Sequence, residues 1–307
     1  MNRNESAGPQ LGLVCITVGP AVRYRTVTRT RYLGMAEQER LAHLRQLYRD
    51  NLSRLFGALA FCHANGIRLY RVTSALFPQI DDPIGARVVQ ELKEPMAGFG
   101  REAKRLGIRV VLHPDQYVVL NSESDAVVQR SLGIMERHAM VFDMLGLPRS
   151  SWSVMILHGG KGGRAEELVQ VIRTLPAGVR KRLVLENDES AYGASAILDI
   201  CHKARVPMVF DVHHHAIKER LSSYDDPSIA EMIRAAAATW PEPQWQIVHL
   251  SNGERSFNDP RHSELISCIP AAMRSVPWIE VEAKGKEEAI AQLRKQGKWP
   301  SEKSVSQ

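Results

Sequence analysis

The segment IRVVLH (residues 108–113) is a short apolar run, rich in β-branched side chains, that ends on a residue able to bind a metal. Such a run is typical of a buried strand, and a helix-like stretch follows it. Five further runs have the same form: SVMILH (153–158), RLVLE (182–186), PMVFD (207–211), QWQIVH (244–249) and WIEVE (278–282). The sequence therefore predicts a repeated strand–helix unit whose strands end on a histidine or a carboxylate.

Two more runs, residues 11–17 and 67–73, bring the number of predicted strands to eight. Helices are predicted at residues 36–65, in a stretch that ends near 106–107, and at 124–145, 165–175, 194–204, 228–240, 263–274 and 286–295. Eight parallel strands with crossover helices can close into a barrel that has no free edge. We therefore predict an α/β protein with a single (β/α)8 TIM barrel, and a doubly wound open sheet is the alternative.

The composition fits one large domain in a reducing compartment. The chain has 307 residues, 44% of them hydrophobic, and we predict one domain over residues 1–307 with flexible tails at 1–10 and 297–307. The four cysteines are scattered without a C-x-x-C pair, which argues against disulfides and zinc ribbons. Since no apolar run resembles a signal peptide or a membrane span, we expect a cytoplasmic protein without membrane contact.

The polar strand ends predict a metal centre. In a parallel barrel these ends meet at one rim, so the side chains converge although they lie far apart in sequence. Each one alone could be a capping residue, but carboxylates crowded at one rim repel one another unless a cation neutralises them. Nitrogen and oxygen ligands suit Mn²⁺ or Zn²⁺, and Mg²⁺ less well, and more than one ion is expected. The predicted ligands are His113, His158, Glu186, Asp211, His249 and Glu282.

Two segments beyond the strands extend this centre. The run DVHHH begins at Asp211, and one of its histidines (His213, His214 or His215) is expected to join the metal site. His262, in the segment DPRHSEL, is a further candidate. The glycines of HGGKGG (158–163) would let backbone approach a ligand closely, but the run lacks the ending of a Walker A loop.

Arginines alternate with tyrosines and threonines just after the first predicted strand. Such a segment is either a solvated loop or a loop that grips phosphates and offers aromatic faces for stacking. The formal net charge of +6 is compatible with a polyanionic partner but does not establish one. The candidate contact residues are Arg23, Arg25, Arg29, Arg31 and Tyr32.

These motifs, in this order, resemble the UV damage endonuclease family, within the wider superfamily of metal-dependent barrel AP endonucleases and sugar isomerases. HPDQYVVLNS (113–122) and LEND (185–188) are specific, whereas VHLS (248–251) alone is weak. ILHGG (156–160), PMVFDVHHH (207–215) and EAKGKE (282–287) complete the resemblance. It implies a DNA repair endonuclease that cuts damaged double-stranded DNA immediately 5′ of UV-induced or other helix-distorting lesions. Manganese is the usual metal, and no organic cofactor is expected.

The resemblance also implies roles for individual residues. Glu186 bridges two ions, and we expect catalysis to depend most on Glu186, His249 and Glu282. Gln116 and Tyr117 match the pair that similar enzymes push into the DNA helix at the damage. The implied ligands are His113, His158 and Glu186 for one ion, Glu186, Asp211, His249 and Glu282 for a second, and His214 and His262 for a third.

Two positions depart from the family pattern. Similar proteins have a lysine two residues before the histidine of strand seven, which can be carboxylated and assist metal binding, and this chain has Ile247 there. They also tend to have a histidine after strand two where this chain has Asp82. Ile247 brings no ligand atom, and whether Asp82 compensates with its own carboxylate is left open. We therefore predict two tightly held ions, with a third site near His214 and His262 that is weak or empty.

Two other functions remain open at this point. A sugar-phosphate isomerase or epimerase could use the same barrel and ligands, but its pocket needs neither a basic rim nor a wedge such as Gln116 and Tyr117. A catalytically idle DNA-binding relative is the third possibility, which Ile247 and Asp82 keep open. Metal-dependent nicking of damaged DNA distinguishes the three.

Overall fold

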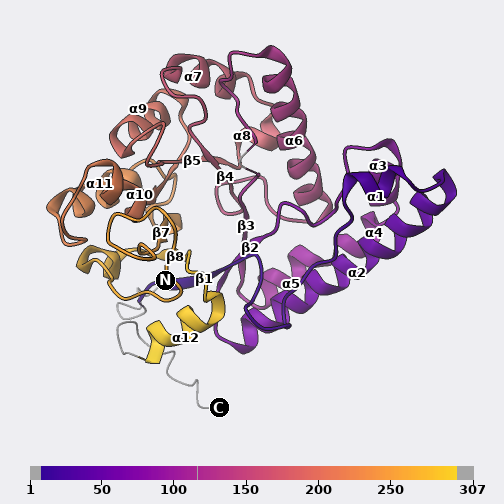
Figure 1. Ribbon diagram of the computed structural model, residues 1–307, viewed down its shortest axis with the longest axis horizontal. Helices are drawn as coiled ribbons and strands as arrows, with labels where there is room; N and C mark the ends of the chain where they lie inside the picture. Colours follow the sequence, from indigo (N-terminus) through magenta and orange to yellow (C-terminus); the bar gives the residue numbers. More distant parts are fainter. Residues whose placement is uncertain (1–7, 116, 296–307) are drawn as a thin grey trace.

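Eight parallel strands form a closed barrel, in which each strand pairs with its sequence neighbours and β1 pairs with β8. The computed structural model describes residues 8–115 and 117–295. Figure 1 shows the barrel with the helices around it. The predicted TIM barrel is confirmed, and the β1–β8 pairing excludes an open sheet. The strands are β1 (Gln10–Val14), β2 (Leu69–Val72), β3 (Arg109–Leu112), β4 (Met155–His158), β5 (Leu183–Glu186), β6 (Met208–Asp211), β7 (Ile247–Leu250) and β8 (Trp278–Val281).

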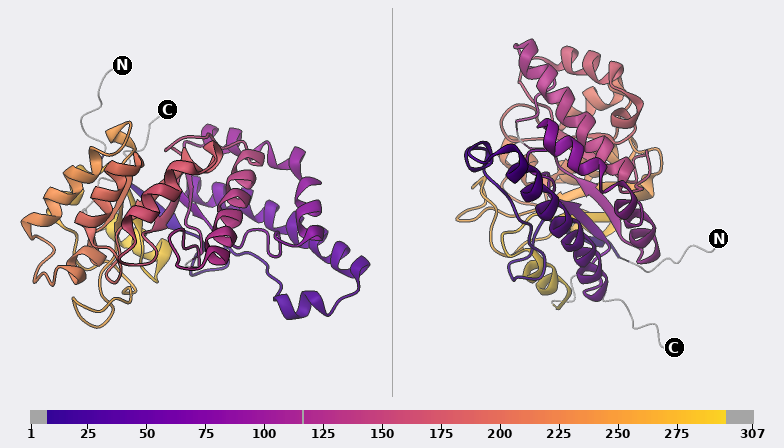
Figure 2. Two further views of the ribbon diagram at one scale, coloured as in Figure 1. Left: turned by 90° about the horizontal axis from the view of Figure 1, so that it is seen from above. Right: turned by 90° about the vertical axis from the view of Figure 1, so that its right-hand side faces the viewer.

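The helices largely follow the predicted pattern, with α2 (Glu37–Ala64), α9 (Ala194–Ala204) and α12 (Lys286–Lys295) close to the expected bounds. Before β3, three short helices stand where one was expected. The beginning of α2, with α1 and α3, extends to one side of the barrel (Figures 1 and 2). The other helices are α1 (Arg29–Leu33), α3 (Pro83–Gln90), α4 (Lys93–Met96), α5 (Phe99–Arg105), α6 (Asp125–Met144), α7 (Ala165–Thr174), α8 (Ala177–Arg180), α10 (Val212–Lys218) and α11 (Pro227–Ala237).

The strand–helix alternation breaks after β7, where the helix predicted at residues 263–274 is wrong. The segment is irregular except for a 3-10 helix at Ala271–Ser275. Asn252 holds the backbone in a loop, because its Oδ1 accepts the N–H groups of Ser267 and Cys268, each at 2.9 Å. Pro270 also lacks an N–H and disfavours a helix before it. The resulting loop carries His262, which forms an isolated bridge with Gly253.

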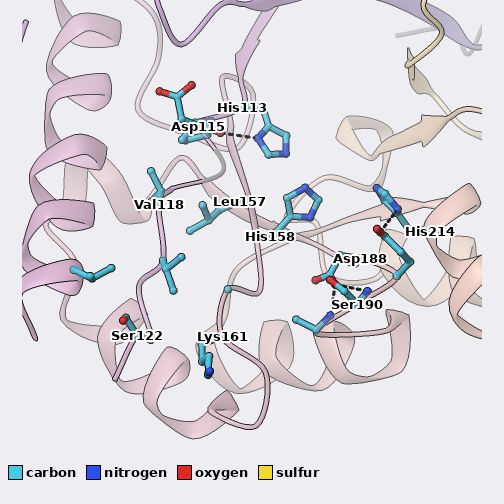
Figure 3. A pocket seen from close by; sticks show the side chains of 16 residues that line it. His113, Asp115, Val118, Ser122, Leu157, His158, Lys161, Asp188, Ser190 and His214 are labelled. Atoms are coloured by element: carbon cyan, nitrogen blue, oxygen red, sulfur yellow. Dashed lines mark hydrogen bonds and ion pairs between the residues drawn. The ribbon is translucent and has the colours of Figure 1, made fainter. Parts of the chain in front are cut away.

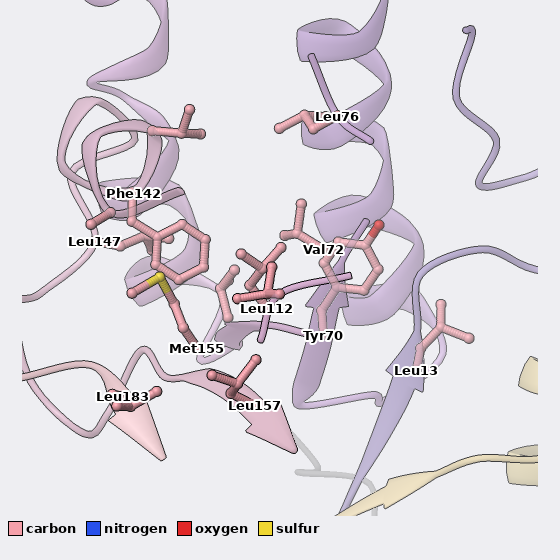
Figure 4. Packing of buried hydrophobic residues seen from close by; sticks show 14 of the residues in the cluster. Leu13, Tyr70, Val72, Leu76, Leu112, Phe142, Leu147, Met155, Leu157 and Leu183 are labelled. Carbon is pink, nitrogen blue, oxygen red and sulfur yellow. The ribbon is translucent and has the colours of Figure 1, made fainter. Parts of the chain in front are cut away.

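Alternate side chains of the strands pack outward against the helices. Leu13, Tyr70, Leu112 and Leu157 are buried in this layer, and Phe142 of α6 packs against it (Figure 4). Burial of such side chains contributes about 1.5–3 kcal/mol each. This layer holds the strands rigidly, so the residues at their carboxyl ends have fixed positions.

The inward-facing side chains below the predicted ligands form a separate apolar layer. Ile156, Val184, Val209 and Ile247 each lie two residues before a predicted ligand, hence on the same face of their strands, and all belong to one buried cluster. Beneath them Arg109 closes the barrel. Its guanidinium donates to the carbonyl oxygens of Trp152 (2.7 Å), Trp245 (2.7 Å) and Ser151 (2.8 Å) and lies over the rings of Trp152, Trp240 and Trp278.

The predicted flexible tail at residues 1–10 wrongly includes Gln10. Gln10 begins β1, and its N–H donates to the carbonyl oxygen of Pro277 at 2.9 Å. Residues 1–7 and the predicted C-terminal tail lie outside the described residues. Within the described ranges, no helix combines the length and apolar character that a membrane span requires.

Candidate metal centre

The register of the strands brings the predicted ligands together. His158 lies opposite Glu186 across β4 and β5, and Asp211 lies opposite His249 across β6 and β7. Each of these residues is at or near the carboxyl end of its strand, the end at which barrel enzymes place their sites. Convergence of the polar strand ends therefore follows from pairing alone.

Glu186 stands at the middle of the cluster and uses its two oxygens in different directions. Oε2 lies 3.1 Å from His113 Nε2 and 3.9 Å from His158 Nε2, whereas Oε1 lies 2.8 Å from His249 Nδ1. Burial alone would raise the pKa of this carboxyl, but the charges of His249 and His158 and the contact with His113 lower it well below 4.5. Glu186 is therefore an ionised carboxylate shared between the His113 and His158 pair on one side and His249 on the other.

Three overlapping groups of side chains have the composition and spacing of divalent-metal sites. Within each group every residue offers one nitrogen or oxygen atom, and these atoms all lie within 4.8 Å of one another. Nitrogen and carboxylate ligands of this kind suit Mn²⁺ or Zn²⁺. The groups are His113, His158 and Glu186; Glu186, Asp211 and His214; and Asp211, His249 and Glu282.

Asp211 provides a direct test of whether a cation fits. Its Oδ2 is buried and has no hydrogen-bond partner among the described residues, which is costly for a charged oxygen unless a cation binds there. Its other oxygen accepts the N–H of His214 at 2.7 Å. Asn187 fixes the backbone of Asp211 by exchanging two hydrogen bonds with it, each 2.9 Å long. A positioned oxygen without a partner is what a metal ligand requires.

The histidines of the first group are oriented for ligation. His113 donates from Nδ1 to the carbonyl oxygen of Pro114 at 2.9 Å, which leaves the Nε2 lone pair directed at the Glu186 side. Burial lowers the pKa of His158, which favours the neutral imidazole that binds metals. Figure 3 shows the His113 and His158 rings beside each other, and their centroids are 5.0 Å apart.

Of the DVHHH histidines, His214 is the one that reaches the cluster. Its Nδ1 also lies 2.6 Å from Glu189 Oε2, a carboxylate that sequence reasoning missed. His213 has both nitrogens engaged, one with the Asp259 carbonyl at 2.8 Å and one with the Tyr224 hydroxyl at 2.7 Å. His215 lies next to Ser228 Oγ instead.

His262 lies at the edge of the cluster. Its Nε2 is 3.9 Å from Glu282 Oε2, and its ring centroid is 6.4 Å from that of His214. Within the described ranges it is not a member of any of the three groups. A third ion between His214 and His262 therefore has less support from the geometry than the first two.

Two further charged residues lie in the cluster, and sequence reasoning overlooked both. Glu280 is fully buried, and its Oε2 is 2.6 Å from His249 Nε2. Arg71, in the middle of β2, is 2.6 Å from Glu280 and 2.5 Å from Glu282. A signal for Glu280 was present, because residues two apart on a strand share a face and Glu282 was already a predicted ligand. Arg71 was visible as a charged residue inside an apolar strand.

A hollow of about 610 Å³ opens beside the metal cluster. His113, His158 and His214 line one side, and Lys161 lies on the glycine-rich loop (Figure 3). Asn121 fixes that loop, since its Oδ1 accepts the Lys161 N–H at 2.8 Å. Gly160 has φ of 74°, and a Cβ there would lie 2.4 Å from the same oxygen, so glycine is required.

The predicted DNA-contact residues have different environments. Tyr117 is 74% exposed, whereas Gln116 lies outside the described residues. Arg25 pairs with Asp50, and Arg29 Nη1 is 3.5 Å from Asp81.

Arg31 is exposed and Arg23 is half-buried, with its Nη2 donating to the carbonyl oxygen of Val18 at 2.6 Å. The expectation that Tyr32 stacks on a base is wrong for this conformation, because its ring is fully buried and its hydroxyl donates to Asp82 at 2.7 Å.

Asp82 does not compensate for the missing lysine. Its Oδ1 accepts the N–H of Ile84 at 3.0 Å and caps α3, and it also accepts the Tyr32 hydroxyl. Among the described residues it belongs to none of the ligand groups. Ile247 lies in the apolar layer beneath the ligands, so neither departure from the family pattern supplies a metal ligand.

The closed barrel, with histidines and carboxylates at one rim, is a fold that several solved structures share. D-psicose 3-epimerase, solved in the presence of D-fructose, has this fold with a TM-score of 0.51 and 11% identity over 91% of this chain and 89% of that one. The structure described as SacUVDE is more similar, with a TM-score of 0.77 and 22% identity over 94% of this chain and 99% of that one.

Sequence comparison narrows this fold class to one family. Residues 9–306 match the family described as UV-endonuclease UvdE, and the chain belongs to that family. The UV DNA damage endonuclease of Nostoc sp. is 53% identical over 292 residues, which cover 94% of this chain and 91% of that protein. The UV DNA damage endonuclease of Deinococcus radiodurans is 50% identical over 291 residues, with 94% and 95% covered.

Proposed function

We propose that the chain is a DNA repair endonuclease that hydrolyses the phosphodiester immediately 5′ of UV-induced or other helix-distorting lesions in double-stranded DNA. The observation that carries this proposal is the position of Glu186, because one carboxylate oxygen faces His113 and His158 and the other faces His249. A shared carboxylate of this kind suits two neighbouring divalent ions, the arrangement used for phosphodiester hydrolysis. Membership of the UvdE family supports the same activity.

The side chains divide into two principal ion sites. His113, His158 and Glu186 would hold one ion. Asp211, His249 and Glu282 would hold a second, which Glu186 would share because its Oε1 lies beside His249. His214 and His262 would serve a third, weaker site. Burial lowers the pKa of His214, but the Asp211 charge and the hydrogen bond to Glu189 outweigh it and raise the value to about 10. A third ion must therefore displace a proton from His214.

Bound divalent ions supply a hydroxide at neutral pH and neutralise the charge that develops on the transferred phosphate. The protein's own contribution is positioning. Glu186 and Asp211 are held by hydrogen bonds and are at most 1% exposed, so their charges are concentrated where water is largely excluded. We propose Mn²⁺ as the ion, with Zn²⁺ or Mg²⁺ as substitutes, because the ligands combine imidazole with carboxylate.

DNA recognition is assigned to exposed and basic residues. Tyr117 is exposed and lies in the chain between Asp115 and Val118, which line the hollow; with Gln116 it would enter the helix where a lesion has weakened stacking. Arg23, Arg25, Arg29 and Arg31 would contact phosphates. Lys161, whose side chain is 56% exposed at the rim of the hollow, is placed to do the same.

A nicking assay tests this function. Metal-stripped protein is added to UV-irradiated, abasic and intact duplexes, and each divalent metal is returned separately. We expect nicks 5′ of lesions only with metal, and most with Mn²⁺. Full nicking by protein shown to be metal-free would reject the mechanism. DNA binding that is salt-sensitive and independent of metal, without nicking, would identify a catalytically idle relative. Conversion of a ketose phosphate without nicking would identify an isomerase.

A further inference from the structure

Arg71 and Glu280 lie directly beneath the ligands as an ion pair inside the barrel. Arg71 is 6% exposed and Glu280 is 0% exposed. The Arg71 Nε lies 3.1 and 3.2 Å from the two Glu280 oxygens, and Nη2 lies 2.6 Å from Oε2. This is a two-nitrogen contact with one carboxylate, the geometry in which arginine binds most specifically.

Glu280 also contacts His249, on the side of the ring that faces away from the other ligands. His249 Nε2 lies 2.6 Å from Glu280 Oε2, whereas Nδ1 lies 2.8 Å from Glu186 Oε1 and 3.5 Å from Glu282 Oε1. The register explains the contact, because His249 and Glu280 are directly opposed across β7 and β8. A neutral imidazole has one N–H and one lone pair, so donation of Nε2–H to Glu280 leaves Nδ1 for an ion.

Arg71 connects this histidine to a second ligand. The same Nη2 that binds Glu280 lies 2.5 Å from Glu282 Oε1. His249 Nε2 is 3.0 Å from Nη2, as expected for two donors that share one acceptor oxygen. Arginine stays charged at all ordinary pH values and presents its N–H groups in a rigid fork. One side chain therefore fixes both Glu280 and Glu282.

We infer that Arg71 and Glu280 are positioning residues for the second ion site. Glu280 selects the His249 tautomer that directs Nδ1 at the ion, and Arg71 holds Glu280 and Glu282 at the required distance from it. Neither residue binds the ion. This inference rests on the proposed metal-dependent function and adds that the affinity of the second site is set by a pair of charges in the layer beneath the ligands.

Titration of the full chain with Mn²⁺ tests this positioning role. The signal of the free ion is followed during the titration and gives the affinity of each binding step. Glu280→Gln keeps the size of the side chain but loses the charge that fixes His249. We expect one of the two main binding steps, the one that belongs to the second site, to lose about 10- to 100-fold in affinity, the usual effect of removing a partner behind a ligand. The kcat for nicking should fall while KM for damaged duplex stays near the original value. Glu280→Asp should recover part of the affinity.

Arg109 offers a matched control, since it is also a buried arginine inside the same barrel but lies on the floor, among tryptophans. Arg71→Lys should weaken Mn²⁺ binding, whereas Arg109→Lys should lower the melting temperature and leave Mn²⁺ binding unchanged. If Glu280→Gln and Arg71→Lys fold and bind Mn²⁺ as the original chain does, the inference is wrong. If the original chain itself binds no divalent ion, the proposed function fails instead.

If Glu280→Gln does not fold, the comparison of Arg71→Lys with Arg109→Lys still distinguishes a positioning role from a structural one. Equal affinity in both variants would reduce Arg71 and Glu280 to a structural ion pair. A loss confined to Arg71→Lys supports a positioning role, because general destabilisation would affect both.

Discussion

Glu186 and His249 contact each other through Oε1 and Nδ1 at 2.8 Å, although they are 63 residues apart in the sequence. The contact joins β5 to β7 across the open end of the barrel, with Asp211 of β6 between them. It also joins the first group of ligands, which contains Glu186, to the third, which contains His249. Loss of the Glu186 charge should therefore affect both groups at once.

Glu186→Gln tests that expectation. The amide keeps the size of the side chain but cannot share a negative charge between two ions, so we expect nicking to fall by more than about 100-fold. Metal content should fall with it, while circular dichroism stays that of the original protein. Glu231→Gln, on the exposed surface of α11, is the control and should keep full activity. Normal nicking by a Glu186→Gln chain that retains its metal would remove this residue from the mechanism.

The number of tightly held ions follows from two positions that supply no metal ligand. We expect about two ions per chain to survive dialysis, because Ile247 brings no ligand and Asp82 is engaged elsewhere. Elemental analysis measures this number directly. His262→Ala should leave it unchanged, whereas His158→Ala should lower it. Retention of three ions would show that the third site is as complete as the others.

Arg29 and Arg31 are expected to contact DNA phosphates. Each arginine engaged with duplex phosphate contributes about 0.9 to the salt slope of log affinity, so Arg29→Ala with Arg31→Ala should flatten the slope by about 1.8. The affinity for damaged and for intact DNA should fall by the same factor, since contacts to phosphates do not distinguish a lesion from normal DNA. Arg234→Ala, on α11, removes an equal charge from another surface and serves as the control. An unchanged slope in the double variant would leave the loop without a role in binding.

Tyr117 is expected to provide preference for damage. Its ring is 74% exposed, and stacking of an aromatic side chain on bases is worth about 1–3 kcal/mol each. Tyr117→Ala should lower the ratio of binding to damaged over intact duplex by about tenfold or more, whereas Tyr117→Phe should keep it. The comparison is made by competition binding with Ca²⁺ in place of Mn²⁺. Equal ratios for all three chains would assign the discrimination to other residues.

The stability of the metal-free protein should depend on pH in a defined way. Burial lowers the pKa of His249, but the charges of Glu186 and Glu282 outweigh it and raise the value well above 6.5. Its contribution is thus complete below pH 6.5 and is lost as pH rises through the raised pKa. The carboxyl pKa values of Glu186 and Glu282 are lowered from 4.5, in spite of burial, by nearby positive charges.

The contribution of the Glu186 and Glu282 carboxylates to stability is complete above pH 4.5 and is lost as the pH falls. Metal-free protein should therefore melt at the highest temperature between pH 4.5 and 6.5. Bound Mn²⁺ should move this maximum to higher pH, because the ion replaces a proton on His249. Thermal unfolding of chelator-treated and loaded protein measures both curves. A metal-free melting temperature that rises steadily from pH 5 to pH 8 would contradict the assignment of charges.

The sequence predicted the strands and the ligands at their ends because both depend on local patterns. A β-branched run that stops on His158 or Glu186 fixes the end of a strand, and parallel pairing then brings the ends together. The loop after β7 was mispredicted because a side chain of Asn252 competes with the helix for backbone hydrogen bonds. That competition depends on residues fifteen or more positions away, which local patterns do not record.

Tyr32 was assigned the wrong role, and Arg71 was missed, for a related reason. A tyrosine among arginines has the same sequence signature whether it is exposed or, as here, buried against Asp82. Arg71 acts through Glu280, which is 209 residues later in the chain, so the pair exists only once the barrel has closed. The ligands could be read from single strands, whereas the residues that hold them could not.

Arg109 ties the completion of the barrel to the arrival of a late part of the chain. Its guanidinium donates to the carbonyl oxygen of Trp245, which is 136 residues further on. A polypeptide that stops before Trp245, on a stalled ribosome or after proteolysis, leaves this charge inside an incomplete enclosure without one of its acceptors. Burying it there costs several kcal/mol. Partial barrels should therefore stay open to proteases, and resistance to digestion should not appear before synthesis has passed Trp245 and the strands that follow it, β7 and β8.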